Sequence, residues 1–142
     1  MPEFVMPLGN TSAEFAIQYR RSLDDFTRGY IDAIFFTECH ADNPELEDAT
    51  INDFSDEAWA RILTDCADFQ GLNRELLDEA YDHETTLYDA ECAGIDYWLT
   101  RNGHGAGFWD RGLGAVGDRL SNACRWQELD LYRGDDGKLY FA

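Results

Sequence analysis

Basic residues are scarce in this chain of 142 residues, where 11 Lys and Arg stand against 29 Asp and Glu. Long apolar runs are also absent, since no stretch approaches the roughly 18 residues that a membrane-spanning helix needs. The opening segment, MPEFVMPLGN, lacks a basic region and has too short an apolar run for a secretory signal peptide. We therefore expect a cytoplasmic protein that makes no membrane contact.

Closely spaced cysteines are absent as well. Cys39, Cys66, Cys92 and Cys124 stand far apart, and no two of them form C-x-x-C. Four cysteines suffice for a disulfide framework, but nothing else indicates export, so free buried thiols are favoured. Ligand pairs at metal spacing are missing, which argues against a structural zinc site.

Apolar residues make up 44% of the chain and aromatic residues 14%, which is enough to build a core. A disordered chain of this charge would contain few aromatic residues. The length suits one domain, and we expect residues 1–142 to form it.

The first half of the chain has the spacing of amphipathic helices. A capping-box pattern at Thr11–Glu14 predicts a helix start, and a second capping signal at Ser22–Asp25 leaves open one bent helix or two. The apolar stripe of this region recurs every three or four residues and consists of Phe15, Tyr19, Leu23, Phe26, Tyr30 and Ile34. An acidic loop containing Asn43-Pro44 follows.

Two further helices are predicted, one capped by Ser55 and one following Asn73, and a short one is expected over Thr86–Ala93. The first of them buries Trp59, Ile62, Leu63, Cys66 and Phe69 and turns Glu57, Arg61, Asp65 and Asp68 outward. The second buries Leu76, Leu77, Ala80 and Tyr81 and exposes Glu75, Asp78, Glu79 and Asp82.

From Ile95 the pattern changes to strands. IDYWLT and GFW flank the turn RNGHGA, and ELDLYR and KLYFA flank the turn GDDG, with a helix in LGAVGDRLSNACRW between the pairs. Turns this short favour antiparallel pairing. The predicted fold is α+β: an acidic helical layer (residues ~12–93) packed on a small antiparallel sheet with ββαββ order (residues ~95–142).

Glycine is concentrated between Trp98 and Gly117. Gly112–Gly117 fits G-x-G-x-x-G and Asp130 follows at a suitable distance, which is the outline of a dinucleotide fingerprint. That fingerprint needs a parallel βαβ unit, and the predicted hairpin and the small number of strands argue against one, so we expect no cofactor. The same hairpin holds a second candidate site, for catalysis or ligand binding, or else a plain Arg–Asp pair with aromatic packing. Its members are Arg101, His104, Trp109, Asp110 and Arg111.

Negative charge is concentrated in the middle of the chain. Residues 38–96 hold 18 acidic and two basic residues, a net charge of −16, whereas residues 97–142 hold six of each. Oxygen ligands in the loop at Asp42–Asp48 depart from EF-hand spacing, so we expect no metal. The predicted partner-binding surface consists of Asp42, Glu45, Glu47, Asp48, Asp53, Glu57, Asp65, Asp68, Glu75, Asp78, Glu79, Asp82 and Glu84.

The electrostatic field of this negatively charged segment repels nucleic acid and attracts basic grooves of other proteins. Carboxylates on rigid helices can stand in for the phosphates of a duplex and compete for the Lys/Arg channel of a nucleic-acid-binding protein. The expected partner is therefore a basic nucleic-acid-binding surface rather than nucleic acid itself. The same charge also arises where a surface is merely solvated, or where the host is salt-adapted.

The segments DYWLTRNGHGAGFWDRGLG and DLYRGDDGKLYFA, with RGYIDAIFFTE and ADFQ upstream, resemble an uncharacterised family of small acidic proteins encoded by phages and prophages. The resemblance implies an accessory protein made inside an infected or lysogenic bacterium, and it carries no established activity. Three hypotheses follow. The first is a non-catalytic inhibitor of a host defence complex, such as CRISPR surveillance or a restriction enzyme. The others are a small enzyme or ligand-binding domain at the Arg101–Arg111 hairpin, and a structural or assembly protein.

Overall fold

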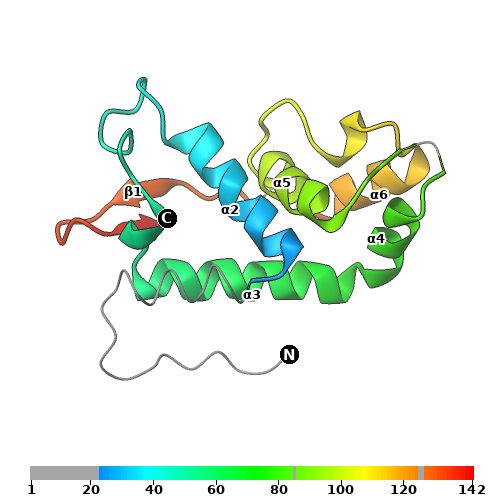
Figure 1. Ribbon diagram of the computed structural model, residues 1–142, viewed down its shortest axis with the longest axis horizontal. Coiled ribbons are helices and arrows are strands. Elements are labelled where there is room, and N and C mark those ends of the chain that lie inside the picture. Colours follow the sequence, from blue (N-terminus) through cyan, green and yellow to red (C-terminus); the bar gives the residue numbers. More distant parts are fainter. Residues whose placement is uncertain (1–22, 85, 125–126) are drawn as a thin grey trace.

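The computed structural model describes residues 23–84, 86–124 and 127–142, which form a helix-dominated α+β structure. Figure 1 shows α3 along one long side, with α2 and α5 packed over it, α4 and α6 at one end, and the strands at the other. No helix in the described residues is long and apolar enough to cross a membrane. The elements are α2 (Asp25–Glu38), η1 (Ile51–Asp53), α3 (Asp56–Leu72), α4 (Arg74–Tyr81), α5 (Ala90–Arg101), η2 (Phe108–Asp110), α6 (Ala115–Ala123), β1 (Leu131–Arg133) and β2 (Leu139–Phe141).

Helices α2 and α5 cross in backbone contact, and two glycines make this crossing possible. A Cβ on Gly94 would lie 1.8 Å from the carbonyl oxygen of Phe26, and a Cβ on Gly29 would lie 2.1 Å from that of Glu91. Any side chain at either position would force the helices apart. The close crossing brings Trp98 of α5 onto α2, where its indole N–H donates to Thr37 Oγ1 at 2.8 Å.

The predicted strand IDYWLT is wrong, because this segment forms half of α5. Asp89 caps the helix by accepting a hydrogen bond from Cys92 N at 2.9 Å, and the small residues Ala93 and Gly94 let it approach α2. Tertiary packing therefore overrides the strand preference of the branched and aromatic residues. The short helix expected over Thr86–Ala93 correspondingly begins only at Ala90.

The ββαββ order is also wrong. GFW lies in the 3₁₀ turn η2, so no hairpin joins it to α5, and the described residues contain only the two antiparallel strands β1 and β2. Those two strands and their turn were predicted, with Tyr132 paired to Tyr140 at their centre. The hairpin packs beside the start of α3, where Ser55 N donates to Leu139 O at 3.0 Å, rather than forming a layer under all the helices.

The remaining helices are found where they were predicted within the described residues. Their predicted faces hold in part, because Leu63, Leu76 and Tyr81 are only partly buried and Asp65, predicted to face outward, pairs with a buried arginine. Ser55 caps α3 by accepting from Ala58 N at 3.0 Å, α4 follows Asn73, and α6 lies within the predicted segment. The apolar stripe is buried from Leu23 onward, while the helix start expected at Thr11 lies outside the described residues. All five described helices and both strands contribute to one continuous core. At its centre the rings of Phe26, Phe69, Tyr97 and Phe108 pack on one another.

Candidate functional site

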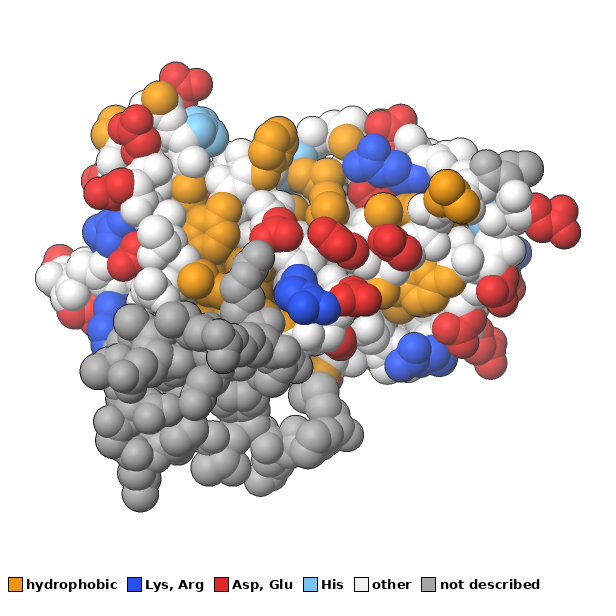
Figure 2. All heavy atoms as spheres, in the orientation of Figure 1, with side chains coloured by type: hydrophobic (Ala, Val, Ile, Leu, Met, Phe, Trp, Pro, Cys, Tyr) orange, Lys and Arg blue, Asp and Glu red, His pale blue; other side chains and the backbone are white. Residues whose placement is uncertain are grey.

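Eleven of the thirteen acidic residues predicted to bind a partner are exposed, and Asp53 and Asp65 are partly buried. They do not share one face. Figure 2 shows acidic side chains at both ends of the view and in a row across its middle. One group belongs to the loop at Asp42–Asp48 and another to α4 and the residues after it, at opposite ends of α3, while Glu57 and Asp68 are exposed on α3 between them. A helix of 17 residues is about 25 Å long, so the two groups are separate surfaces.

Asp65 is part of a buried ion pair. Its Oδ2 accepts from Arg101 Nη1 at 2.9 Å and from Arg61 Nε at 2.8 Å. The Arg101 guanidinium is fully buried and also donates to the hydroxyls of Tyr30 and Tyr97. Such an ion pair stabilises the folded state, because removing either side chain would leave the charge of the other buried and unpaired. Asp65 and Arg101 are therefore structural residues rather than parts of a binding surface.

Two more acidic candidates have local partners. Asp53 closes a capping box at η1, where its Oδ2 accepts from Thr50 N at 2.8 Å. Asp48 lies 3.7 Å from Arg133, but its side chain is almost fully exposed, and surface pairs of this kind contribute little. The loop group thus includes one paired carboxylate, and η1 uses another for capping.

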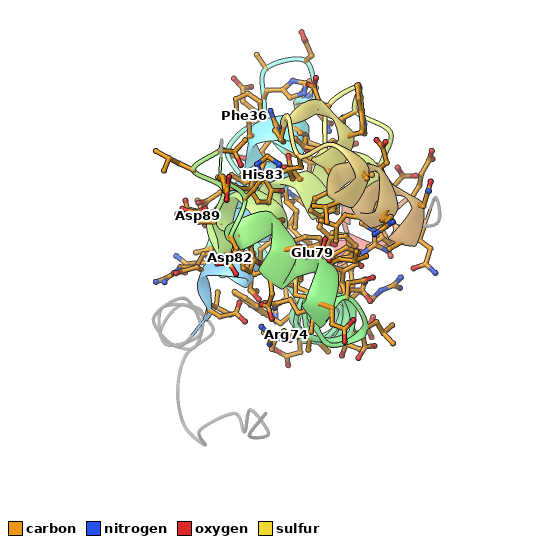
Figure 3. The ribbon with its side chains drawn as sticks, turned by 90° about the vertical axis from the view of Figure 1, so that its right-hand side faces the viewer. Phe36, Arg74, Glu79, Asp82, His83 and Asp89 are labelled. Carbon is orange, nitrogen blue, oxygen red and sulfur yellow. The ribbon has the colours of Figure 1, made fainter. Side chains whose placement is uncertain are left out.

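Helix α4 carries the acidic group without such partners. Glu75, Asp78, Glu79 and Asp82 are all exposed, and none forms an ion pair with any described residue. Leu77 and Ala80 anchor the opposite side of the helix in the core. Figure 3 looks onto this end of the molecule, with Glu79 and Asp82 on α4, Asp89 beyond them and Arg74 below. The end surface is therefore negatively charged and held on a helix whose inner side is packed.

Three of the four acidic residues of α4 oppose the dipole of the helix, whereas Glu75 lies in the first turn, where the dipole favours negative charge. Asp78, Glu79 and Asp82 lie in its last turn and at its C-cap, where no basic residue occurs, and Arg74 begins the helix. A helix favours negative charge at its N-terminus and positive charge at its C-terminus. Helix stability therefore does not explain why these carboxylates are there.

The second candidate site does not assemble as predicted. Arg101 is buried as described, and Arg111 binds Asp96 instead of its neighbour Asp110, through Nε at 2.9 Å. Asp96 is buried and also accepts from Tyr88 OH at 2.5 Å. The expected Arg–Asp pair thus exists with another carboxylate. Sequence spacing missed it because Asp96 was placed in a strand, whereas the helix α5 turns it toward the Arg111 loop.

The structure brings His104 and Trp109 together at a pocket of about 600 Å³. Leu99 and Thr100 at the end of α5 form one wall, and the last turn of α6 with Asn122 forms another. Asp110 points to solvent and is not among the lining residues. No sequence signal marked Thr100 or Asn122, because only the packing of α5 against α6 places them beside the glycine-rich loop.

The cysteines provide no reactive group. All four are free, with Cys66 and Cys124 buried and the other two partly buried. Burial raises the pKa of the Cys124 thiol to about 12 and that of Cys39 to about 11. Both thiols are therefore protonated at neutral pH, and a thiolate is the form that attacks or binds metal.

Neither a metal site nor the dinucleotide fingerprint finds support in the described residues. No group of three or more His, Cys, Asp or Glu there is arranged to hold a metal ion. Gly112 and Gly114 have positive φ and precede α6, but a 3₁₀ turn leads into them where the fingerprint requires a parallel strand. In comparisons with known proteins, no family model, curated protein or solved structure matches the chain.

Proposed function

We propose that this is a phage-type accessory protein that inhibits a host nucleic-acid-binding defence complex without catalysis. In this proposal the acidic end surface, defined as Glu75, Asp78, Glu79 and Asp82 of α4, occupies a basic groove made for nucleic acid. The host complex is a CRISPR surveillance complex or a restriction enzyme. The observation that carries the proposal is a row of four exposed carboxylates, free of ion pairs with described residues, on one helix.

The spacing of the four residues favours simultaneous contact with a basic groove. Their positions are i, i+3, i+4 and i+7, which places them on one stripe with neighbouring Cβ atoms about 5–6 Å apart. The core anchors Leu77 and Ala80 limit the freedom of the helix, so binding orders little that was not ordered before. The net charge of −18 adds long-range attraction to a basic partner and repels free nucleic acid.

The position of the charges against the helix dipole supports a role outside stability. If helix stability alone determined these positions, Lys or Arg would be favoured at the C-terminal end of α4. Because Asp78, Glu79 and Asp82 oppose the dipole and only Glu75 accords with it, neutralising all four carboxylates should leave the fold intact. This makes the acidic end surface suitable for a clean functional test.

The test compares two variants with the same change in net charge. One is Glu75→Gln/Asp78→Asn/Glu79→Gln/Asp82→Asn. The control is Asp118→Asn/Glu128→Gln/Asp130→Asn/Asp135→Asn, four exposed acids of the neutral C-terminal third. Each protein is used to capture complexes from bacterial lysate at low and high salt, and each captured complex is challenged with duplex DNA.

The proposal predicts that wild type and control retain a nucleic-acid-handling complex that added DNA or high salt displaces, and that the α4 variant does not. When this complex is purified, addition of the wild-type protein should reduce its DNA cleavage or DNA binding. Equal loss in both variants would mean that only total charge matters, which is the expectation for a structural or assembly protein with a solubilising surface. A retained complex that DNA cannot displace, or no retained complex at all, would also overturn the proposal.

A further inference from the structure

A pocket whose lining differs in chemistry from the acidic end surface has the features of a ligand-binding site. The pocket at the end of α5 measures about 600 Å³, within the range of small-molecule sites. It is lined by the glycine-rich loop after α5, by Trp109 and by the last turn of α6, with the loop in yellow and α6 in orange in Figure 1. Its lining contains no Asp, Glu, Lys or Arg.

The loop that lines this pocket is fixed from the inside. Phe108 N donates to Thr100 Oγ1 at 3.2 Å, and His104 N donates to Leu99 O at 3.0 Å. Gly107 lies so close to Thr100 that a Cβ there would meet its Oγ1 at 2.0 Å. The pocket is thus largely preformed, as small-molecule sites usually are.

The lining of the pocket includes backbone donors without a protein partner. Gly105 and Ala106 both line it, and their N–H groups donate to no acceptor among the described residues. Trp109 is 52% exposed, although its neighbour Phe108 is fully buried. The turn η2 therefore sends one ring into the core and presents the other at the edge of the pocket.

We propose that this pocket binds a small neutral ring compound that stacks on the Trp109 indole and offers oxygen acceptors at its edge to the loop N–H groups. An indole face and unpaired donors suit such a ligand. The absence of Lys and Arg from the lining and the net charge of −18 disfavour an anion such as a nucleotide. A sugar and an uncharged nucleoside both present this chemistry. No residue of α4 lines the pocket, so either proposal can fail without the other.

The test is an NMR titration of the isotope-labelled full chain with N-acetylglucosamine and, separately, with uridine. We expect saturable shifts at the amides of Gly105 and Ala106 and at the Trp109 indole with one of the probes, and the probe that saturates identifies the source of the ring. Trp109→Ala should weaken binding by about fivefold or more, because loss of a stacking ring costs about 1–3 kcal/mol.

Tyr132→Ala is the matched control, because Tyr132 is also an exposed aromatic residue but lies on β1, outside the pocket. It should leave binding unchanged, as should the α4 variant. Trp109→Phe should keep part of the affinity, which separates loss of stacking from damage to the loop. The proposal is overturned if neither probe saturates, if the shifts map elsewhere, or if Trp109→Ala binds like wild type.

Discussion

Replacing Gly94 by alanine tests the arrangement of α2 and α5 on which both candidate surfaces depend. The new Cβ would lie 1.8 Å from Phe26 O, whereas ordinary contacts begin near 3.4 Å, so the helices must part by about 1.6 Å. That separation stretches the buried hydrogen bonds from Trp98 to Thr37 and from Arg101 to Tyr30, at 2.8 and 3.0 Å. The two helices then no longer close the core.

The expected cost is about 2–4 kcal/mol in the free energy of unfolding. Overpacking a core costs about 1–3 kcal/mol, and each weakened buried hydrogen bond adds about 1 kcal/mol or more. The helix preference for alanine over glycine returns only about 1 kcal/mol. Since domains are typically stable by about 5–15 kcal/mol, the variant should still fold at low temperature and be measurable.

The assay is urea unfolding monitored by far-ultraviolet circular dichroism, with Gly71→Ala as the control. Gly71 lies in α3 with nothing within 4 Å of a new Cβ, so alanine there should stabilise the protein by about 0.5–1 kcal/mol. Both variants add a single Cβ to a helical glycine, at Gly94 against the backbone of another helix and at Gly71 in open space. If their unfolding free energies differ by less than about 1 kcal/mol, the close crossing of α2 and α5 is refuted.

Two further predictions concern ionisable groups. Burial raises the pKa of the Asp24 carboxyl, but hydrogen bonds from Thr27 and Gln70 outweigh it and hold the pKa below its ordinary value. Asp24→Ala should therefore cost about 1 kcal/mol at neutral pH, and in thermal melts this difference should shrink as pH falls below about 4, where the cap protonates. A difference that persists unchanged at low pH contradicts this. Because the pKa of Cys124 is about 12, Ellman's reagent at pH 8 should modify this thiol at least about a hundredfold more slowly than in the unfolded chain, and equal rates would show that it is not buried.

Local sequence signals predicted the parts of the structure that local forces decide. The hydroxyl of Ser55 and the apolar spacing after it define α3, because a cap and a 3.6-residue period act within one helix. The turn GDDG predicted the β1–β2 hairpin for the same reason. The acidic stripe of α4 was also readable, since its exposed and buried positions alternate with the helical period.

Tertiary packing decided the rest. Tyr97 and Trp98 have strand-forming side chains, yet they lie on a helix because Gly94 lets α5 meet α2 in backbone contact, and no local pattern encodes where that partner lies. The same packing pairs Arg101 with Asp65, residues 36 positions apart, and so removes Arg101 from the surface and leaves Asp65 only partly exposed.

The candidate surfaces show the same division. The sequence alone determined how much negative charge the middle of the chain carries, because charge depends only on composition. Only the tertiary structure decided that this charge is spread over several surfaces instead of one face, and that His104 and Trp109 meet Asn122 at one pocket. Distances between elements arise from the way their buried faces fit together, and that fit is a property of all the faces at once.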